Sequence, residues 1–190
     1  MLEIRWHGRG GQGAKTAALM LAEIVFVSGK FATGFPEYGP ERMGAPITAY
    51  NKISDKPIRD HSNIYDPDIV VVADYTLLSQ VSVTDGLKND GKILINSKPQ
   101  DRGKIKEEFA TLNSKIYTID ANKIAAETIG KNIPNTVLLA SVVKISEILE
   151  KDDFFKYVEE AFNHKFAKKE EVIKGNIQAI KRGFEEVEKI

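Results

Sequence analysis

The sequence predicts an α/β fold: a doubly wound, mostly parallel sheet with a helical C-terminal region. Short apolar runs typical of buried strands alternate with longer segments whose apolar residues recur at helical spacing. The run at 69–74 is continuously apolar and largely β-branched until its final aspartate, as is typical of a central strand covered on both faces. A glycine cluster separates the first strand from the first helix. Together these features are typical of strands connected by helices that cover both faces of one sheet.

The composition favours one globular unit. The 190 residues fit a single domain over 1–190, with 151–190 as a helical extension of that same domain. The hydrophobic share of 42% is enough for a full core, and 27 basic residues balance 27 acidic ones. A net charge of zero argues against a dedicated nucleic-acid binder. The apolar runs are too short to cross a membrane and no secretion signal is visible, so we expect a cytoplasmic protein.

The sequence contains no cysteine. The chain therefore offers no thiol nucleophile and no cysteine ligand for zinc or an iron–sulfur cluster. Its three histidines, His7, His61 and His164, lack the spacing of metal ligands. No serine lies in a Gly-x-Ser-x-Gly elbow either. We therefore predict no catalytic residue and no metal site in this chain.

Capping residues and hydrophobic periodicity place the individual elements. Asp74 is expected to cap a segment at 76–81, and Asp120 to cap a helix that Gly130 closes. Pro134 suits the first turn of the next helix. Strands are expected at 2–6, 30–35, 47–53, 69–74, 91–96 and 115–119. Helices are expected at 14–27, 121–129, 135–150, from 152 or 153 to 162, and at 168–189.

Four glycines lie between the first strand and an alanine-rich helix. Gly8, Gly10 and Gly13 match the spacing of a dinucleotide-binding turn, Gly11 adds one more, and Gln12 lies among them. Such a turn lets backbone N–H groups at a helix N-terminus approach an anion, which the helix dipole also favours. The alternative is that the glycines only allow the helix to pack tightly on its strand. The residues alone leave both interpretations open.

A stiff loop follows the second expected strand. Residues 35–46 contain three prolines and two glycines, which exclude regular structure. The same stretch carries aromatic and charged side chains, a composition more typical of a binding loop than of a spacer. The candidate binding or contact residues are Glu37, Tyr38, Glu41 and Arg42. A local Glu–Arg network that only holds the loop together is the alternative.

Two nucleotide-binding classes fit these residues poorly. An NAD site would place an acidic residue at the end of the second strand, about 20 residues beyond the glycines. The candidate, Glu37, follows Pro36 and belongs to the stiff loop. Lys15 and Thr16 resemble the end of a phosphate-binding P-loop, but Ala14 breaks its spacing. His7 could contact a ligand or act as a base, although a hydrogen bond to the turn backbone is the favoured role.

Two stretches together identify a family. Residues 6–14 and 37–47 resemble the gamma subunit of pyruvate:ferredoxin oxidoreductase (pyruvate synthase), within the 2-oxoacid:ferredoxin oxidoreductase gamma family. Residues 68–74, 96–97 and 135–140 resemble later segments of that family. Gamma subunits that act on 2-oxoisovalerate, 2-oxoglutarate or indolepyruvate share the Gly-Gly-Gln-Gly core and remain alternatives. A free-standing nicotinamide-dependent oxidoreductase is the alternative from another class.

The resemblance implies a reaction of pyruvate, coenzyme A and oxidised ferredoxin that gives acetyl-CoA, carbon dioxide and reduced ferredoxin. It implies a heterotetramer with alpha, beta and delta subunits, in which thiamine diphosphate, Mg²⁺ and [4Fe-4S] clusters are bound by those other subunits. The lack of cysteine agrees with that division, and the isolated chain is expected to be inactive. Residues 8–13 are then expected to contact a coenzyme A phosphate or to hold the backbone for a neighbouring subunit. Glu37, Tyr38, Glu41 and Arg42 are expected at a subunit contact.

Overall fold

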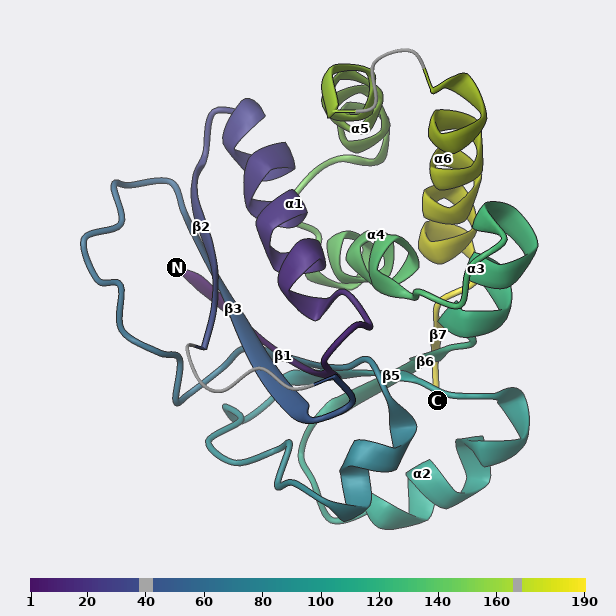
Figure 1. Ribbon diagram of the computed structural model, residues 1–190. Helices are drawn as coiled ribbons and strands as arrows, with labels where there is room; N and C mark the ends of the chain where they lie inside the picture. The colour runs from purple at the N-terminus through teal and green to yellow at the C-terminus, as the bar shows by residue number, and fades with distance from the viewer. Residues whose placement is uncertain (38–42, 166–168) are drawn as a thin grey trace.

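The protein is described by a computed structural model that covers residues 1–37, 43–165 and 169–190 (Figure 1). Within these ranges one sheet has the strand order β2-β3-β1-β4-β5-β6-β7. None of the helices in the same ranges is both long and apolar enough to span a membrane. The strands are β1 (Leu2–Arg9), β2 (Phe31–Pro36), β3 (Pro46–Ser54), β4 (Ile69–Val72), β5 (Lys92–Asn96), β6 (Lys115–Ile119) and β7 (Glu188–Lys189).

Most strands of this sheet run in one direction. β1 pairs with β4, β4 with β5, and β5 with β6, all in parallel. β3 lies antiparallel between β1 and β2, and β7 pairs antiparallel with β6. Only β3 and β7 therefore oppose the other strands of the described sheet. The predicted α/β class with a mostly parallel sheet is confirmed, and β4 is buried throughout, as its apolar run predicts.

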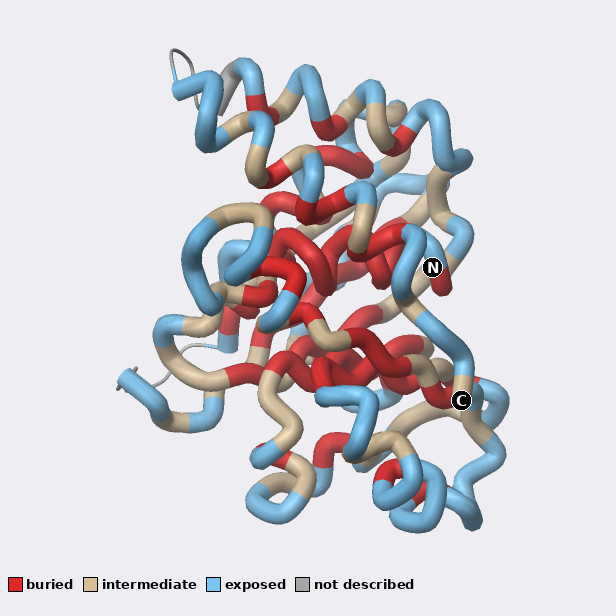
Figure 2. Tube along the Cα trace, turned by 90° about the vertical axis from the view of Figure 1, so that its right-hand side faces the viewer, coloured by how far each residue is buried: buried red, intermediate tan, exposed pale blue. Residues whose placement is uncertain are grey.

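Helices cover both faces of the sheet (Figure 1). One face carries α1 (Ala14–Val27), α3 (Ala121–Ile129), α4 (Asn135–Ser146), α5 (Lys151–Lys165) and α6 (Glu170–Glu185), which share one apolar core. The other face carries the 3₁₀ helix η1 (Tyr75–Ser79) and α2 (Arg102–Glu108), which enclose a second core. A further 3₁₀ turn, η2 (Pro99–Asp101), leads into α2. Figure 2 shows buried segments in the interior and exposed segments on the outer helix surfaces.

Close packing fixes α1 on the sheet. A Cβ atom on Gly34 of β2 would lie 2.4 Å from the carbonyl oxygen of Ala18, so only glycine permits this approach. Asn51 of β3 donates from Nδ2 to the same Ala18 oxygen at 2.8 Å. Its Oδ1 accepts a 2.8 Å bond from the indole nitrogen of Trp6, which is fully buried. These contacts hold α1 close to β1, β2 and β3.

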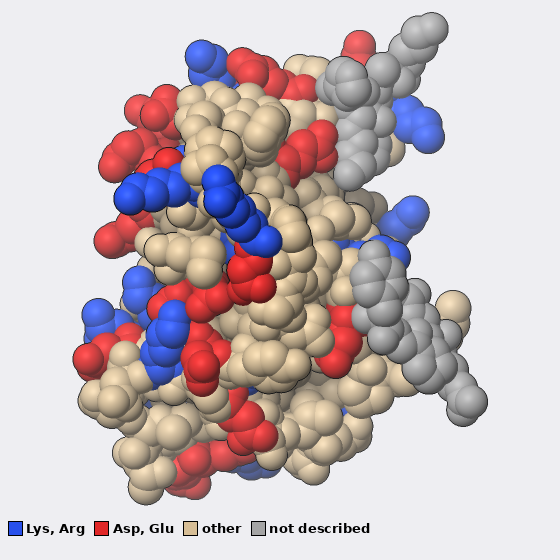
Figure 3. Space-filling view, turned by 90° about the vertical axis from the view of Figure 1, so that its left-hand side faces the viewer, with Lys and Arg blue, Asp and Glu red and all other residues tan. Residues whose placement is uncertain are grey.

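Acidic and basic side chains are interspersed on the face shown in Figure 3. Ion pairs among the described residues include Lys30 with Asp55 and Lys52 with Asp60. The Lys52 side chain is only 1% exposed, whereas its partner Asp60 is largely in solvent.

Several element boundaries were predicted correctly. α1, β6 and α3 occupy the predicted residues, Asp120 accepts a 3.0 Å bond from the backbone of Lys123, and Gly130 ends α3 with a φ of 69°. Asp74 caps η1 through a 2.9 Å bond from the Thr76 backbone. The segment that Asp74 caps is the 3₁₀ helix η1 at Tyr75–Ser79, shorter than the expected segment at 76–81.

Other boundaries were predicted wrongly, each for a local reason. β1 extends past residue 6 to Arg9 because β3 pairs with it along its whole length. The helix expected at 135–150 ends at Ser146, since Glu147 takes a left-handed φ of 58°. The helix expected at 168–189 spans Glu170–Glu185 among the described residues, because Glu188 and Lys189 pair with β6 as β7. α2 was not predicted, although Ile105 and Phe109 have helical spacing and are both buried.

Candidate functional site

A tight turn connects the end of β1 to the beginning of α1. Gly11 and Gly13 adopt φ values of 94° and 81°, a conformation that favours glycine. The backbone N–H of Gln12 donates to the carbonyl oxygen of Arg9 at 3.0 Å and closes the turn. Gly13 caps α1 without a side-chain hydrogen bond, and the first turn of α1 contains no acidic residue. The first turn of α1 therefore carries no carboxylate of its own that would offset the positive end of the helix dipole.

The segment that begins at Met43, after the residues that the structure does not describe, lies beside this turn. The backbone N–H of Gly10 donates to the carbonyl oxygen of Ala45 at 2.9 Å, and that of Gly44 donates to the Gly10 oxygen at 3.1 Å. Gly10 also forms a parallel bridge with Met43, whose side chain is 96% exposed. The glycine turn and the end of the proline-rich loop thus form one structural unit, although they are far apart in the sequence.

Two of the predicted site glycines have a packing role. Gly8 lies within β1 and not in the turn, so its predicted placement was wrong; it pairs with Ile47 of β3. A Cβ atom on Gly8 would lie 3.0 Å from that of Ala14. A Cβ atom on Gly13 would lie 2.9 Å from that of Asn135, at the start of α4. Close helix packing therefore explains why position 8 is glycine. At Gly13 it is a second reason for glycine, beside the positive φ.

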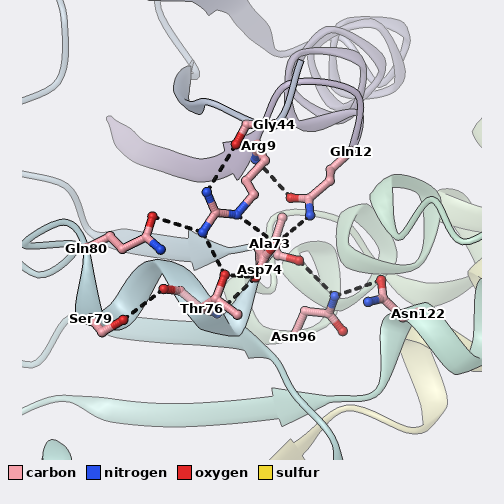
Figure 4. Close-up of polar contacts among 10 residues, drawn as sticks. All are labelled: Arg9, Gln12, Gly44, Ala73, Asp74, Thr76, Ser79, Gln80, Asn96 and Asn122. Carbon is pink, nitrogen blue, oxygen red and sulfur yellow. Dashed lines mark hydrogen bonds and ion pairs between the residues drawn. The ribbon is translucent and has the colours of Figure 1, made fainter. Parts of the chain in front are cut away.

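Arg9 forms the centre of a polar network at the ends of β1 and β4 (Figure 4). Its Nε donates to Asp74 Oδ2 at 3.1 Å, and its Nη1 donates to the Gly44 carbonyl oxygen at 3.1 Å. Nη2 donates to Thr76 Oγ1 at 2.7 Å and to Gln80 Oε1 at 3.0 Å. One guanidinium group thus connects the glycine turn, the loop that returns to it, and η1.

Gln12 and Asp74 complete this network. Gln12 accepts a 2.9 Å bond from the backbone of Arg9 and donates to Asp74 Oδ2 at 2.6 Å. Although burial opposes it, hydrogen bonds from Thr76 and Gln12 and the charge of Arg9 hold the pKa of Asp74 below its usual value. Asp74 is therefore ionised at neutral pH and balances the charge of Arg9.

The network fills a position where doubly wound proteins bind ligands. After β1 the chain passes to α1 on one face of the sheet, whereas after β4 it passes to η1 on the other face. Such divergent connections open a gap at the carboxyl ends of neighbouring parallel strands. Here Arg9, Gln12 and Asp74 occupy that gap.

Asn96 fixes the adjacent strand ends and was not predicted to do so. It is 4% exposed, and its Nδ2 donates to the carbonyl oxygen of Ala73 at 2.8 Å and to Asn122 Oδ1 at 3.0 Å (Figure 4). Its Oδ1 accepts a 2.9 Å bond from the backbone of Ala121. One amide thereby joins the ends of β4 and β5 to the beginning of α3. A polar residue directly after the apolar run at 93–95 was the available sequence signal.

Of the predicted contact residues in the proline-rich loop, Glu37 lies within the described ranges. It continues the pairing of β2 with β3 through a 2.8 Å bond from its N–H to the Thr48 oxygen, and its side chain is exposed. The hydroxyl of Tyr50 donates to Glu37 Oε2 at 3.2 Å. Burial, followed by the charge and hydrogen bond of Glu37, raises the pKa of Tyr50 to about 12. Tyr38, Glu41 and Arg42 lie outside the described residues, so their predicted role stays a prediction.

The His7 side chain contacts Arg5 of its own strand and the backbone of Val83, and not the glycine turn, so the favoured sequence interpretation was wrong. Its Nε2 accepts a 3.1 Å hydrogen bond from Nε of Arg5. The imidazole ring also forms a hydrogen bond with the backbone of Val83. Burial and the nearby Arg5 charge lower the pKa of His7 to about 4. Arg5 is itself held by the carbonyl oxygens of Tyr65 and Val83 at 3.3 and 3.1 Å. His7 is therefore a neutral acceptor at neutral pH.

This low pKa makes the stability of the protein depend on pH. Because the unfolded chain binds a proton at His7 below about pH 6.5 and the folded chain does not, stability falls as the pH is lowered toward 4. The expected slope from this group is about 1.4 kcal/mol per pH unit. Urea unfolding of His7→Gln between pH 4.5 and 7.5 should show a correspondingly smaller slope. The control variant His61→Gln changes an exposed histidine and should leave the slope unaltered. Equal slopes for wild type and His7→Gln would contradict the conclusion that His7 makes stability depend on pH.

The described residues contain no group of three or more His, Asp or Glu side chains placed to hold a metal ion. Together, the fold and this site define an α/β protein in which a glycine turn at the start of the first helix is hydrogen-bonded to the end of a proline-rich loop. A sequence model of the family described as pyruvate ferredoxin/flavodoxin oxidoreductase matches residues 3–186.

Individual relatives match over nearly their whole length. The chain is 46% identical to pyruvate synthase subunit PorC of Thermotoga maritima, over 97% of this chain and 94% of that protein. It is 40% identical to the pyruvate/ketoisovalerate oxidoreductases common subunit gamma of Pyrococcus abyssi, over 99% and 98%. The crystal structure of the T. maritima PORC subunit aligns with a TM-score of 0.82 at 41% identity, covering 98% of this chain and 97% of that one. The chain belongs to the pyruvate ferredoxin/flavodoxin oxidoreductase family, as a gamma-type subunit, and the predicted family is confirmed.

The same fold also occurs inside a longer polypeptide. A 2-oxoglutarate:ferredoxin oxidoreductase from Magnetococcus marinus aligns with a TM-score of 0.69 at 17% identity, covering 96% of this chain but 30% of that one. At this identity the similarity concerns the fold alone. It shows that an α/β unit of this kind can be either a separate chain or a part of a larger one.

Proposed function

We propose that the chain is the gamma subunit of a complex that oxidises pyruvate with coenzyme A and ferredoxin to acetyl-CoA and carbon dioxide. The observation that carries this proposal is the full-length similarity to a pyruvate synthase subunit at 46% identity. A second candidate substrate is ketoisovalerate, because a relative at 40% identity is named as a gamma subunit common to both oxidoreductases. The 2-oxoglutarate and indolepyruvate alternatives gain no comparable support.

The proposed complex is a cytoplasmic heterotetramer with alpha, beta and delta subunits. The sequence has no cysteine, and no cluster of histidines or carboxylates within the described ranges suits a metal ion. These residues do not fit an iron–sulfur cluster, so we assign thiamine diphosphate, Mg²⁺ and the [4Fe-4S] clusters to the partner subunits. Affinity purification of the tagged chain from its native host tests this assignment. Three copurifying subunits that carry thiamine diphosphate and iron are expected, whereas a solitary chain would contradict the proposal.

Within this complex we assign the glycine turn, Gly10, Gly11, Gln12 and Gly13, to a phosphate of coenzyme A. Support comes from the N-terminus of α1, which has neither a side-chain cap nor an acidic residue in its first turn. The Arg9–Asp74 pair holds the turn in place beside it. In this role the chain supplies backbone N–H groups and orientation, while the chemistry of decarboxylation and electron transfer stays with the partners.

A matched pair of glycine substitutions tests the phosphate role. Gly11 and Gly29 lie at opposite ends of α1 with φ values of 94° and 88°, and a Cβ atom on either meets nothing within 4 Å. Aspartate therefore causes similar backbone strain at both positions, but only Gly11→Asp places a negative charge at the proposed phosphate site. In the purified complex, Gly11→Asp should raise the KM for coenzyme A about tenfold, consistent with one charge-assisted contact. Gly29→Asp should leave it unchanged. Equal KM values for the two variants would leave the turn with a structural role only.

A further inference from the structure

β2 is an end strand of the sheet, and no strand among the described residues pairs with its outer edge. On its inner side β2 pairs with β3, and the bond from the Glu37 N–H to the Thr48 oxygen continues that ladder. Because the hydrogen-bonding direction alternates along a strand, the odd-numbered residues of β2 direct their backbone groups toward β3. The N–H and C=O groups of Ala32 and Gly34 therefore point away from the sheet, where another strand can pair with them.

The helix that packs on β2 has an exposed apolar side. α1 comes closest to β2 at Ala18, whose carbonyl oxygen lies against Gly34. Leu19, Ala22 and Phe26 lie about 40–100° around the helix from Ala18, on the side away from its buried residues. Leu19 is 45% exposed and Phe26 is 64% exposed. α4 and α5 pack on the other side of α1 (Figure 1), so these three residues, which we call the α1 stripe, lie beside the outer edge of β2.

The sequence of β2 is nearly symmetric about Thr33. Residues 31–35 read Phe-Ala-Thr-Gly-Phe, with a phenylalanine at each end and a small residue on either side of the centre. When two such strands pair antiparallel across Thr33, Ala32 of each lies opposite Gly34 of the other, and the two residues exchange both backbone hydrogen bonds. Pro36, which has no N–H to donate, lies outside these bonded pairs. The outer edge of β2 is thus complementary to itself.

The same register also pairs aromatic side chains. Phe31 lies opposite Phe35 of the second copy, at a position where the side chains of antiparallel strands come closest. Phe31 is 38% exposed, and Phe35 already contacts Tyr50 of β3 with ring centroids 5.3 Å apart. Cross-strand aromatic pairs of this kind stabilise sheets. The second copy therefore covers Phe31 on the sheet face opposite α1.

A two-fold axis at Thr33, perpendicular to the sheet, covers the α1 stripe as well. Since α1 packs on β2, the axis places the two α1 helices antiparallel on the same face of the joined sheets, with their stripes facing each other. A single strand from another protein would pair with β2 but leave the stripe exposed. The net charge of zero also means that two copies do not repel each other at long range. These features favour a second copy of the chain as the partner.

We propose that two copies of this chain associate through β2 and form one continuous sheet across a two-fold axis at Thr33, with the two α1 stripes in contact. Such an interface uses the same surface of both copies, as is common in symmetric dimers. The inference goes beyond the proposed function and does not depend on it. It concerns the outer edge of the sheet and makes no use of the glycine turn or of the Arg9–Asp74 pair.

A single cysteine tests the position of the axis. The natural chain has no cysteine, so Thr33→Cys introduces the only thiol. Opposite residues at such a position have Cβ atoms about 4.5–5.5 Å apart, close to the distance that a disulfide requires. Oxidation of the full chain with copper phenanthroline should give a covalent dimer of Thr33→Cys. The control Thr111→Cys places its thiol at an exposed site before β6 and should stay monomeric. No covalent dimer of Thr33→Cys, or equal yields from both variants, would overturn the proposal.

Phe31→Lys tests the side chains of the interface. Sedimentation velocity of the full chain at increasing concentrations should show a reversible dimer. Phe31→Lys should raise its dissociation constant at least tenfold, because the cross-strand aromatic pair is lost. The control Leu112→Lys changes a residue of nearly equal exposure, 37% against 38%, and should leave the constant unchanged. A wild-type chain that stays monomeric, or an unchanged constant for Phe31→Lys, would show that β2 does not join two copies of this chain.

Discussion

Replacing Gly183 by alanine should lower the free energy of unfolding by about 1–3 kcal/mol. Gly183 lies in α6, where a Cβ atom would come within 2.5 Å of the carbonyl oxygen of Val137 and 3.0 Å of its Cα. These are backbone atoms of α4, and Val137 is fully buried, so the contact cannot be relieved by turning a side chain. Ser141 further ties the two helices by donating to the Gly183 oxygen at 2.8 Å. Alanine must therefore move α6 away from α4.

Gly103→Ala is the matched control for this prediction. Gly103 also lies in a helix, α2, but a Cβ atom there meets nothing within 4 Å. Alanine at an exposed helical position should stabilise the protein by up to about 1 kcal/mol, because glycine loses more backbone entropy on folding. Urea denaturation of both variants measures the difference. The two changes should have opposite signs, and a stabilising Gly183→Ala would contradict the described packing of α4 against α6.

Local sequence signals predicted most of the elements correctly. Alanine spacing and the glycine cluster predicted α1, and the run at 69–74 predicted β4, which ends two residues earlier at Val72. Elements that depend on distant partners were predicted less well. β7 exists because Glu188 and Lys189 pair with β6, more than sixty residues earlier in the chain. β1 was predicted too short for the same reason, since β3 determines its end.

The candidate site shows the same division. The spacing of Gly8, Gly10 and Gly13, with Gly11 added, predicted a tight turn at the start of a helix. Positive φ values are found at Gly11 and Gly13, whereas Gly8 lies in β1. The bond between Arg9 and Asp74 joins residues 65 positions apart, so neither motif alone indicated it. Asp74 was predicted as a helix cap, which it is, but its role in balancing Arg9 required the parallel pairing of β1 with β4. Topology, and not local composition, brings these side chains together.

Asp74→Ala is expected to lower the free energy of unfolding by about 3 kcal/mol, the sum of a lost helix cap and lost charge-assisted bonds. Asp74 accepts hydrogen bonds from the Thr76 backbone at 2.9 Å, from Arg9 at 3.1 Å and from Gln12 at 2.6 Å. Its side chain is 19% exposed and that of Arg9 is 20% exposed, so water only partly replaces the missing carboxylate. The comparison variant Asp55→Ala removes an exposed partner of Lys30 and should have no measurable effect.

A double-mutant cycle identifies how much of this loss belongs to the connection between the strand ends. Arg9 loses its charge partner in Asp74→Ala but keeps its bonds to Gly44, Thr76 and Gln80. If the pair acts as one unit, Arg9→Ala combined with Asp74→Ala should cost less than the sum of the single changes, by about 1 kcal/mol or more. Additive effects would show that each side chain acts alone. Coupling would instead mean that the Arg9–Asp74 bond, which connects the ends of two parallel strands, holds the glycine turn in position. Variants that lose this bond should then also show a higher KM for coenzyme A in the complex.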